Sequence, residues 1–152
     1  MWWVAGHRIH HKESDQENDL HSPTVSFFWA HVGWLFYPCP ELKDEKQIIR
    51  YSLDLYNDPG IRFLHKYFLP INIAFAFALF GLGYWIGQMQ GAISMLVWGG
   101  FLRIVAVWHV TWLVNSATHV WGYRNYSTTD FSRNNWVVAL LTFGEGWHNN
   151  HQ

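Results

Sequence analysis

The sequence predicts an all-α integral membrane protein with one transmembrane hairpin and a histidine-rich metal site beside it. Residues 68–87, FLPINIAFAFALFGLGYWIG, contain no charged side chain, and about 20 apolar residues suffice to cross the hydrocarbon core of a bilayer. Residues 92–114 form a second apolar run. Histidines gather in HRIHH at 7–11 and in HNNH at 148–151, and no segment shows the alternation of a strand.

The composition agrees with a membrane protein. The 152 residues include 11 Trp, 7 Tyr and 11 Phe, which is more aromatic mass than a soluble domain of this size uses. The net charge of −1 argues against nucleic acid as a partner. Cys39 is the single cysteine, so no internal disulfide is possible, a reducing compartment is indicated, and the thiol is expected to be buried.

The short segment QMQG, residues 88–91, is too small for a domain, so the two apolar runs are expected to form a helical hairpin. This turn has no Lys or Arg, whereas Arg62 and Lys66 precede the first run and Arg124 and Arg133 follow the second. Cytoplasmic flanks carry the excess of basic residues. Both histidine clusters are therefore predicted to lie on the cytoplasmic face of a multi-pass membrane protein.

Several polar residues are expected to serve structure rather than chemistry. Arg103 interrupts the second run at a cost of about 2.5 to 3.5 kcal/mol, and it is expected to extend to the membrane surface or to pair with a neighbouring helix. His31, His65 and His109 stand alone in their segments and are expected to be hydrogen-bonded packing residues. His21 is expected to support a metal ligand from a loop rather than to be one.

The remaining segments are predicted to be loops and helices. Residues 12–23, KESDQENDLHSP, read as a polar loop. Residues 24–37 are apolar and aromatic but too few to span a bilayer, which favours an interfacial or partly buried helix. Residues 40–60 predict an amphipathic helix that stops at Asp58-Pro59-Gly60. Residues 132–151 predict a capped apolar helix and then a glycine-flanked turn.

The spacing within the histidine clusters is that of metal ligands on helices. Positions i, i+3 and i+4 of a helix share one face, so His7, His10 and His11 can point at a common space. His148 and His151 repeat the i, i+3 spacing. Imidazole ligands without cysteine suit iron, copper, nickel or zinc rather than calcium or magnesium.

His119 adds a sixth candidate ligand just beyond the second apolar run. It follows Asn115 by one helical turn, and Asn115 could hold a metal-bound water. Six histidines exceed what one four-coordinate metal uses, so two metals fit better. Trp3, Trp112 and Trp147 flank the candidate ligands and are expected either to line an apolar slot for a substrate or to serve in packing and interfacial anchoring.

Three kinds of chemistry use such histidines, and the membrane segments separate them. A membrane haem protein places its axial histidines within the spans, where only His109 qualifies. A metal transporter needs ligands or carboxylates near the midplane, and no Asp or Glu occurs between positions 59 and 129. An oxygen-activating site beside the bilayer, with a lipid chain as substrate, accounts for both placements.

The motifs HRIHH, NSATHVWGYRNY and GEGWHNNH closely resemble the second histidine box, the Asn-x-x-x-His helix and the third histidine box of membrane fatty acid desaturases of the Δ9 type. SFFWAHVGWLF and SRNNW are also similar to that family, and DQENDLHSP is most similar to its bacterial, cyanobacterial and plant branch. The resemblance implies a non-haem centre of two iron ions that uses O2 and two electrons to remove two hydrogens from an acyl chain.

The resemblance also implies a role for each matching residue. Asn115 would hold an iron-bound water. The implied iron ligands are His7, His10, His11, His119, His148 and His151. Two features depart from the family pattern: the first histidine box and the first hairpin would lie before Met1, and Gln152 stands where the third box normally has a second adjacent histidine.

The chain is therefore interpreted as a partial desaturase domain, inactive by itself. Residues 1–67 would be cytoplasmic, 68–87 and 92–114 would span the membrane, and 115–152 would return to the cytoplasm. The expected activity is oxygen-dependent desaturation at Δ9 of a stearoyl or palmitoyl chain, carried as acyl-lipid or acyl-CoA, with ferredoxin or cytochrome b5 as electron donor. The alternatives are a membrane di-iron hydroxylase and a non-catalytic membrane protein that binds metal or haem.

Overall fold

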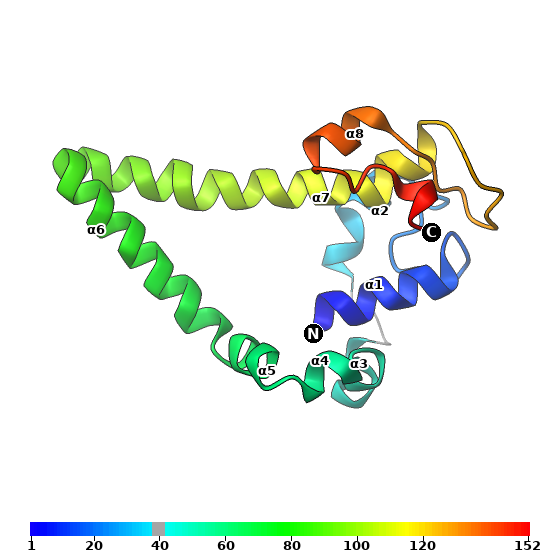
Figure 1. Ribbon diagram of the computed structural model, residues 1–152, viewed down its shortest axis with the longest axis horizontal. Helices are drawn as coiled ribbons and strands as arrows, with labels where there is room; N and C mark the ends of the chain where they lie inside the picture. Colours follow the sequence, from blue (N-terminus) through cyan, green and yellow to red (C-terminus); the bar gives the residue numbers. More distant parts are fainter. Residues whose placement is uncertain (38–41) are drawn as a thin grey trace. The chain divides into compact units, whose positions relative to one another are not determined.

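The computed structural model describes residues 1–37 and 42–152, and its regular elements are helices (Figure 1). Cys39 lies outside the described residues. Pairing of the β type within the described part consists of isolated bridges, from Tyr123 to Asn134 and from Asn134 to Trp147. The predicted all-α class is confirmed. In chain order the helices are α1 (Trp2–Glu13), α2 (Phe27–His31), η1 (Gly33–Phe36), α3 (Glu45–Tyr51), α4 (Leu53–Asn57), α5 (Pro59–Lys66), α6 (Phe68–Ser94), η3 (Met95–Leu102), α7 (Arg103–Val120), α8 (Trp136–Leu141) and η4 (His148–Asn150).

The chain divides into two compact units. We call Met1–Leu53 together with His109–Gln152 the histidine unit, and Asp54–Trp108 the apolar unit, so the boundary falls within α7. The histidine unit has only small apolar cores, of which one is formed by three side chains of α1 and the segment before α3. Its largest fully buried side chains are polar, and they are His10, His148, Asn134, Asn149, Thr118, Ser22, Ser52, Ser116 and Ser132.

The aromatic segment predicted as one helix over 24–37 forms two short pieces. Ser26 caps α2 by accepting a hydrogen bond from the backbone N–H of Trp29. Val32 then leaves the helical conformation, with φ −142° and ψ −26°, and the chain continues as the 3-10 helix η1. This break turns Trp34 into the interior of the histidine unit, where it is buried.

The amphipathic segment is also divided, by Ser52 and Asp58. Ser52 has φ −134° between α3 and α4, and its hydroxyl donates to the carbonyl of Ile48 at 2.6 Å. The predicted helix end is confirmed, since α4 stops at Asn57. Asp58 then caps a further helix, α5, by accepting from the backbone N–H groups of Gly60 and Ile61. A carboxylate before a proline is a strong start signal for a helix, and the sequence analysis used it only as a stop.

The apolar unit folds back on itself at the predicted turn. The described residues contain one helical stretch long and apolar enough to cross a membrane, Phe68–Val120, with a mean hydropathy of 1.7 and 6% of its most apolar window buried. Within α6, Gly87 and Gln88 leave the helical conformation, and Gln88 has φ 52° (Figure 1). Gly83 and Gly91 then lie so close that a methyl group on Gly83 would collide with the carbonyl oxygen of Gly91.

Arg103 finds partners inside the apolar unit. Its Nε donates to the carbonyl of Gly99 at 2.9 Å, and its guanidinium lies 5.9 Å from the centre of the Phe75 ring. Arg103 thus contacts an aromatic face of α6. Its expected extension to the membrane surface, or pairing with a further helix, stays a prediction.

Candidate metal centre

Helix α1 presents its histidines toward the C-terminal segment. The Nε2 atoms of His7 and His11 are 3.0 Å apart, and the Nε2 of His151 lies 3.1 Å from that of His11. The donor atoms of these three rings lie within 4.8 Å of one another, as the ligands of one metal ion must. We call His7, His11 and His151 the outer cluster, because His151 is exposed and the other two are half-buried.

A second group of three rings, the inner cluster, lies deeper. It consists of His10, His119 and His148, which are all buried and whose donor atoms also lie within 4.8 Å of one another. The Nε2 atoms of His119 and His148 are 3.0 Å apart. The six histidines singled out in the sequence thus fall into two groups of three, an arrangement that suits two metal ions.

The C-terminal histidines are placed by a network of buried amides. Asn149 is buried, and its Oδ1 accepts hydrogen bonds from the backbone N–H groups of Asn125 and Tyr126, each at 2.8 Å. The bridge between Asn134 and Trp147 fixes the chain just before η4. His148 therefore points inward because its neighbours in sequence are anchored to the segment after α7.

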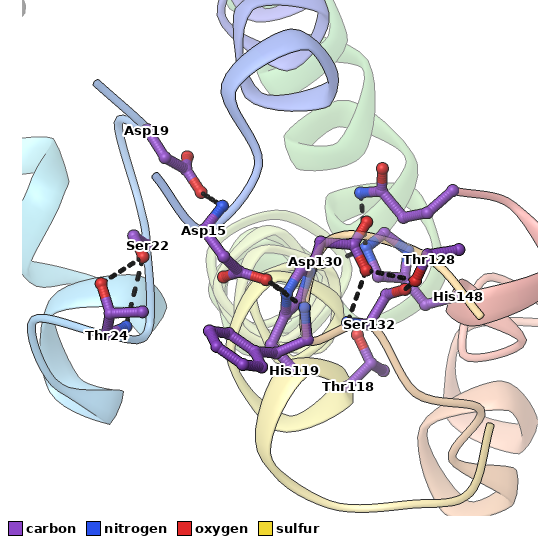
Figure 2. Close-up of polar contacts among 12 residues, drawn as sticks. Asp15, Asp19, Ser22, Thr24, Thr118, His119, Thr128, Asp130, Ser132 and His148 are labelled. Carbon is purple, nitrogen blue, oxygen red and sulfur yellow. Dashed lines mark hydrogen bonds and ion pairs between the residues drawn. The ribbon is translucent and has the colours of Figure 1, made fainter. Parts of the chain in front are cut away.

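Two aspartates orient two rings of the inner cluster. Asp19 Oδ1 accepts from Nδ1 of His10 at 2.9 Å, and Asp15 Oδ2 accepts from Nδ1 of His119 at 2.8 Å (Figure 2 shows the second contact). A carboxylate can only accept, so each ring carries its proton on Nδ1 and has a bare Nε2. Those bare nitrogens belong to the inner cluster, which is how histidine ligands are held in metal sites.

The two aspartates belong to one loop and support each other. The backbone N–H of Asp15 donates to Asp19 Oδ2 at 2.8 Å, as Figure 2 shows, and the N–H of Phe131 donates to Asp15 Oδ2 at 2.7 Å. Burial alone would raise the pKa of Asp19, but the hydrogen bond and the charge of His10 lower it below its ordinary value. The sequence analysis treated this segment as a solvated loop and missed both residues, although acidic residues directly after a histidine cluster were a usable signal.

Burial and neighbouring histidines lower the pKa of three imidazoles in the clusters, those of His7, His11 and His148. Burial, followed by the neighbouring histidines, lowers the pKa of His7 to about 4. The same causes lower the pKa of His148 to about 2. Neutral rings offer a lone pair to a metal ion, whereas protonated rings offer none. His7 and His148 can therefore bind a cation at neutral pH without first losing a proton.

His21 lies against the inner cluster. Its ring centre is 4.1 Å from that of His10, and its Nδ1 is 3.9 Å from Asp19 Oδ1. His10, Asp19 and His21 would also meet the distance criterion for a metal site. However, His10 uses its Nδ1 proton on Asp19, so its one free nitrogen serves the inner cluster. His21 is thus placed as a support of a candidate ligand, as the sequence analysis expected.

A cavity of about 470 Å³ opens beside both clusters. Trp3 and Trp147 line it together with apolar side chains, while Trp112 is not among its lining residues and lies against His31 and His109. Cavity-lining residues that also bear on the metal site are His7, His148, His151 and Asn115. The Nδ2 of Asn115 is buried and has no hydrogen-bond partner within the described part of the chain, so it is available to a bound water or substrate.

The other histidines lie outside both clusters. His31 bonds Ser116 Oγ through Nδ1 at 3.1 Å and His109 Nδ1 through Nε2 at 3.0 Å, which agrees with the packing role expected for both rings. The packing role expected for His65 is not observed among the described residues, because its side chain is exposed on α5.

Gln152 contacts the inner cluster. Its Nε2 lies 3.2 Å from Nε2 of His10 and 3.3 Å from Nε2 of His148. A reversed amide plane would turn its oxygen to this cluster, so Gln152 can also contribute a metal ligand.

The comparison with known proteins identifies the family. The family model described as fatty acid desaturase matches residues 1–151. The chain belongs to the fatty acid desaturase family. It is 50% identical to the sn-1 stearoyl-lipid 9-desaturase of Anabaena variabilis, over 98% of this chain and 51% of that protein. It is 44% identical to the sn-2 palmitoyl-lipid 9-desaturase of Nostoc sp. (strain 36), over 99% of this chain and 50% of that protein.

More distant members differ in the substrate that their names give. The acyl-CoA C20 Delta5-desaturase of Anemone leveillei is 39% identical, over 99% of this chain and 46% of that protein. The chain thus spans about half the length of the curated relatives that it matches. Histidine clusters in a member of this desaturase family indicate a metal site. The donor atoms fit a metal ion, because the nitrogens converge and two of the rings are held by carboxylates. His148 contacts its cluster through Nε2, since its Nδ1 is buried without a hydrogen-bond partner among the described residues.

Proposed function

We propose that this protein is a Δ9 acyl-lipid desaturase, with one iron ion in the inner cluster and one in the outer cluster. The observation that carries the proposal is the division of six imidazoles into two groups of three beside a cavity, in a chain half identical to a stearoyl-lipid 9-desaturase. The acyl chain to be desaturated is a stearoyl or palmitoyl group, the two that the cyanobacterial relatives' names give.

The chain's own residues orient the candidate ligands, position the acyl chain and exclude water from the cavity. The iron pair, when bound, supplies activation of O2 with two electrons for the removal of two hydrogens. Asp15 and Asp19 hold two imidazoles in the tautomer that offers Nε2. The rings of Trp3 and Trp147 give the cavity an apolar wall, along which an acyl chain is held while water is displaced.

Asn115 has a separate part in this proposal. Its carboxamide lines the cavity with His7 and His148 and has a buried, unsatisfied Nδ2. We place there a water bound to one of the irons, which the amide would orient. The Asn115 amide also limits how deep an acyl chain can enter, because burying the amide without a partner costs about 1 to 3 kcal/mol.

The membrane arrangement follows from the turn at Gly87 and Gln88. In this proposal the hairpin crosses the bilayer twice and returns α7 to the cytoplasmic side, where both clusters lie. An electron donor such as ferredoxin or cytochrome b5 would approach from that side. Reporters fused after residue 90 and after residue 125 are expected to lie on opposite faces, and finding both on one face would refute the hairpin as a double crossing.

The activity is tested in a bacterial host that lacks a Δ9 desaturase. The complete open reading frame that contains this chain is expressed there, because the chain spans about half the length of its curated relatives and is expected to be inactive by itself. Membrane fatty acids are measured by gas chromatography with assignment of the double bond. We expect Δ9 products that disappear in His119→Ala and persist in His65→Ala, since only His119 belongs to a cluster. A hydroxylated acyl chain in place of the alkene would replace the proposal by a hydroxylase, and equal loss in both variants would refute the ligand assignment.

A further inference from the structure

A line of aromatic rings runs from the inner cluster to the surface of α1. The ring centres of His10 and His21 are 4.1 Å apart, those of His21 and Trp34 are 5.3 Å apart, and those of Trp34 and Trp2 are 5.9 Å apart. The indoles of Trp34 and Trp2 are stacked, with an angle of 4° between their planes. All these residues belong to the histidine unit, so the line lies within one compact body.

The two ends of this line differ in their surroundings. Trp34 is 6% exposed, whereas Trp2 is 41% exposed. The Nε1 of Trp34 is buried and has no hydrogen-bond partner among the described residues. Leaving such a donor unsatisfied is unfavourable, and phenylalanine would avoid this cost while filling much of the same space. Packing alone therefore does not explain an indole at this position.

The chemistry of the rings suggests what the indole adds. Indole loses an electron more readily than imidazole or phenyl, so Trp34 and Trp2 can each hold an electron vacancy while His21 only bridges the gap to His10. A site that oxidises an unactivated C–H bond forms an oxidant strong enough to attack its own ligands when no acyl chain is bound. This step of the inference depends on the proposed function.

We propose that Trp34 and Trp2 form a protective path that returns electrons to the inner cluster when an oxidant forms there without substrate. Trp34 gives one electron through His21 and His10 and becomes a radical cation. It keeps its Nε1 proton because no acceptor among the described residues bonds to that atom. Trp2 then gives one electron to Trp34 and restores it.

At the surface, a thiol restores Trp2, and the electrons and protons balance. The oxidised Trp2 releases its Nε1 proton to water, and the resulting neutral radical takes one hydrogen atom from a soluble thiol. Two such passes supply two electrons to the cluster and two protons to the solvent, from which reduction of the oxidant draws two. The two thiyl radicals combine into one disulfide. The net reaction is the reduction of the oxidant by two thiols.

The path is tested with copper and hydrogen peroxide, which generate an oxidant at histidine clusters without iron or lipid. The purified chain in detergent is loaded with Cu²⁺, treated with peroxide in the absence of thiol, and mapped by peptide mass spectrometry. We expect oxygen to be added to Trp2 severalfold more than to Trp136, which is more exposed, at 66%, and reports freely diffusing oxidant.

Two variants make the result decisive. Trp34→Phe should lower oxidation of Trp2 to the level of Trp136 and should raise oxidation of His10 and His148 severalfold. Trp2→Phe, which keeps the buried indole, should instead make oxidation accumulate on Trp34, so the test does not depend on the fold of the first variant. Trp136→Phe is the matched control and should change neither.

The outcomes separate this path from the proposed function. Equal oxidation of Trp2 in the wild type and in Trp34→Phe, or no gain at Trp34 in Trp2→Phe, would overturn the path whether or not the protein desaturates lipids. Oxidation of Trp2 that depends on Trp34, found with no Δ9 product in cells, would support the path and refute the desaturase assignment.

Discussion

The histidine unit and the apolar unit keep their shapes by opposite means. The histidine unit buries mainly polar side chains, which are joined through carboxylates, amides and imidazoles. The helical stretch that makes up most of the apolar unit buries only 6% of its most apolar window and presents large hydrophobic side chains outward. A lipid bilayer can cover the exposed hydrophobic side chains of the apolar unit, whereas metal ions can bind the converging imidazoles of the histidine unit. Removing each kind of support should therefore affect only one unit.

The largest effect is expected from removing a candidate ligand of the histidine unit. His10→Ala should abolish metal binding at the inner cluster and, with it, product, because two imidazoles remain where three converged. Metal content by mass spectrometry and fatty acid analysis of membranes check this. His65→Ala is the control, since its ring is exposed on α5. Full metal content in His10→Ala would refute the inner cluster as a binding site.

A smaller effect is expected from the aspartates behind the ligands. Asp19→Asn keeps the size of the side chain but loses the charge that holds the proton on Nδ1 of His10. Metal affinity should fall by about 10- to 100-fold, measured by titration with Co²⁺. Glu17→Gln removes a charge from an exposed position of the same loop and should leave the affinity unchanged. A loss in Glu17→Gln as large as that in Asp19→Asn would assign the effect to the charge of the loop as a whole.

In the apolar unit, the contact between Gly83 and Gly91 should respond to a single methyl group. Gly83→Ala forces the two helical segments apart and should destabilise the hairpin by about 1 to 3 kcal/mol, measured by unfolding in detergent. Gly81→Ala adds the same methyl group where no atom lies within 4 Å and should be neutral or stabilising. Metal binding by the histidine unit should be the same in both variants.

The mildest change, a fall in pH, should again distinguish the units. The pKa of His7 is lowered from 6.5 to about 4 by burial and by neighbouring histidines. As pH falls, His7 is therefore protonated in the unfolded chain before it is protonated in the folded chain. The metal-free histidine unit should therefore be at full stability above pH 6.5 and lose stability progressively between pH 6.5 and about 4. Urea unfolding followed by circular dichroism at pH 7.5 and pH 5 checks the sign, and greater stability at pH 5 would contradict it.

The parts of this molecule that the sequence predicted are those governed by short-range periodicity. The spacing of His7 and His11 placed them on one face of α1, and the composition of 68–114 together with its QMQG interruption predicted where the chain reverses. The capped helix α8 was also predicted, and Asn135 provides its cap. In each case the decisive residues lie within a few turns of one another.

What the sequence could not predict depends on contacts between distant segments or on local backbone choices. The division of the histidines into two clusters requires α1, α7 and η4 to meet, which no spacing encodes. Asp15 escaped notice because its role depends on a left-handed backbone at φ 59° and on a partner in α7. The break at Val32 was missed because an apolar run gives no sign of where a helix bends.

The bond between Asp15 and His119 also sets an order of assembly. The two residues are 104 positions apart, and the apolar unit lies between them in the chain. At about 5 to 20 residues per second, a ribosome needs roughly 5 to 20 seconds to make that interval. Throughout this time His10 can already bind Asp19, while the inner cluster still lacks both of its other rings. The inner cluster is thus completed only after the apolar unit has been synthesised, so a nascent chain cannot hold the complete candidate metal site before that unit has been made.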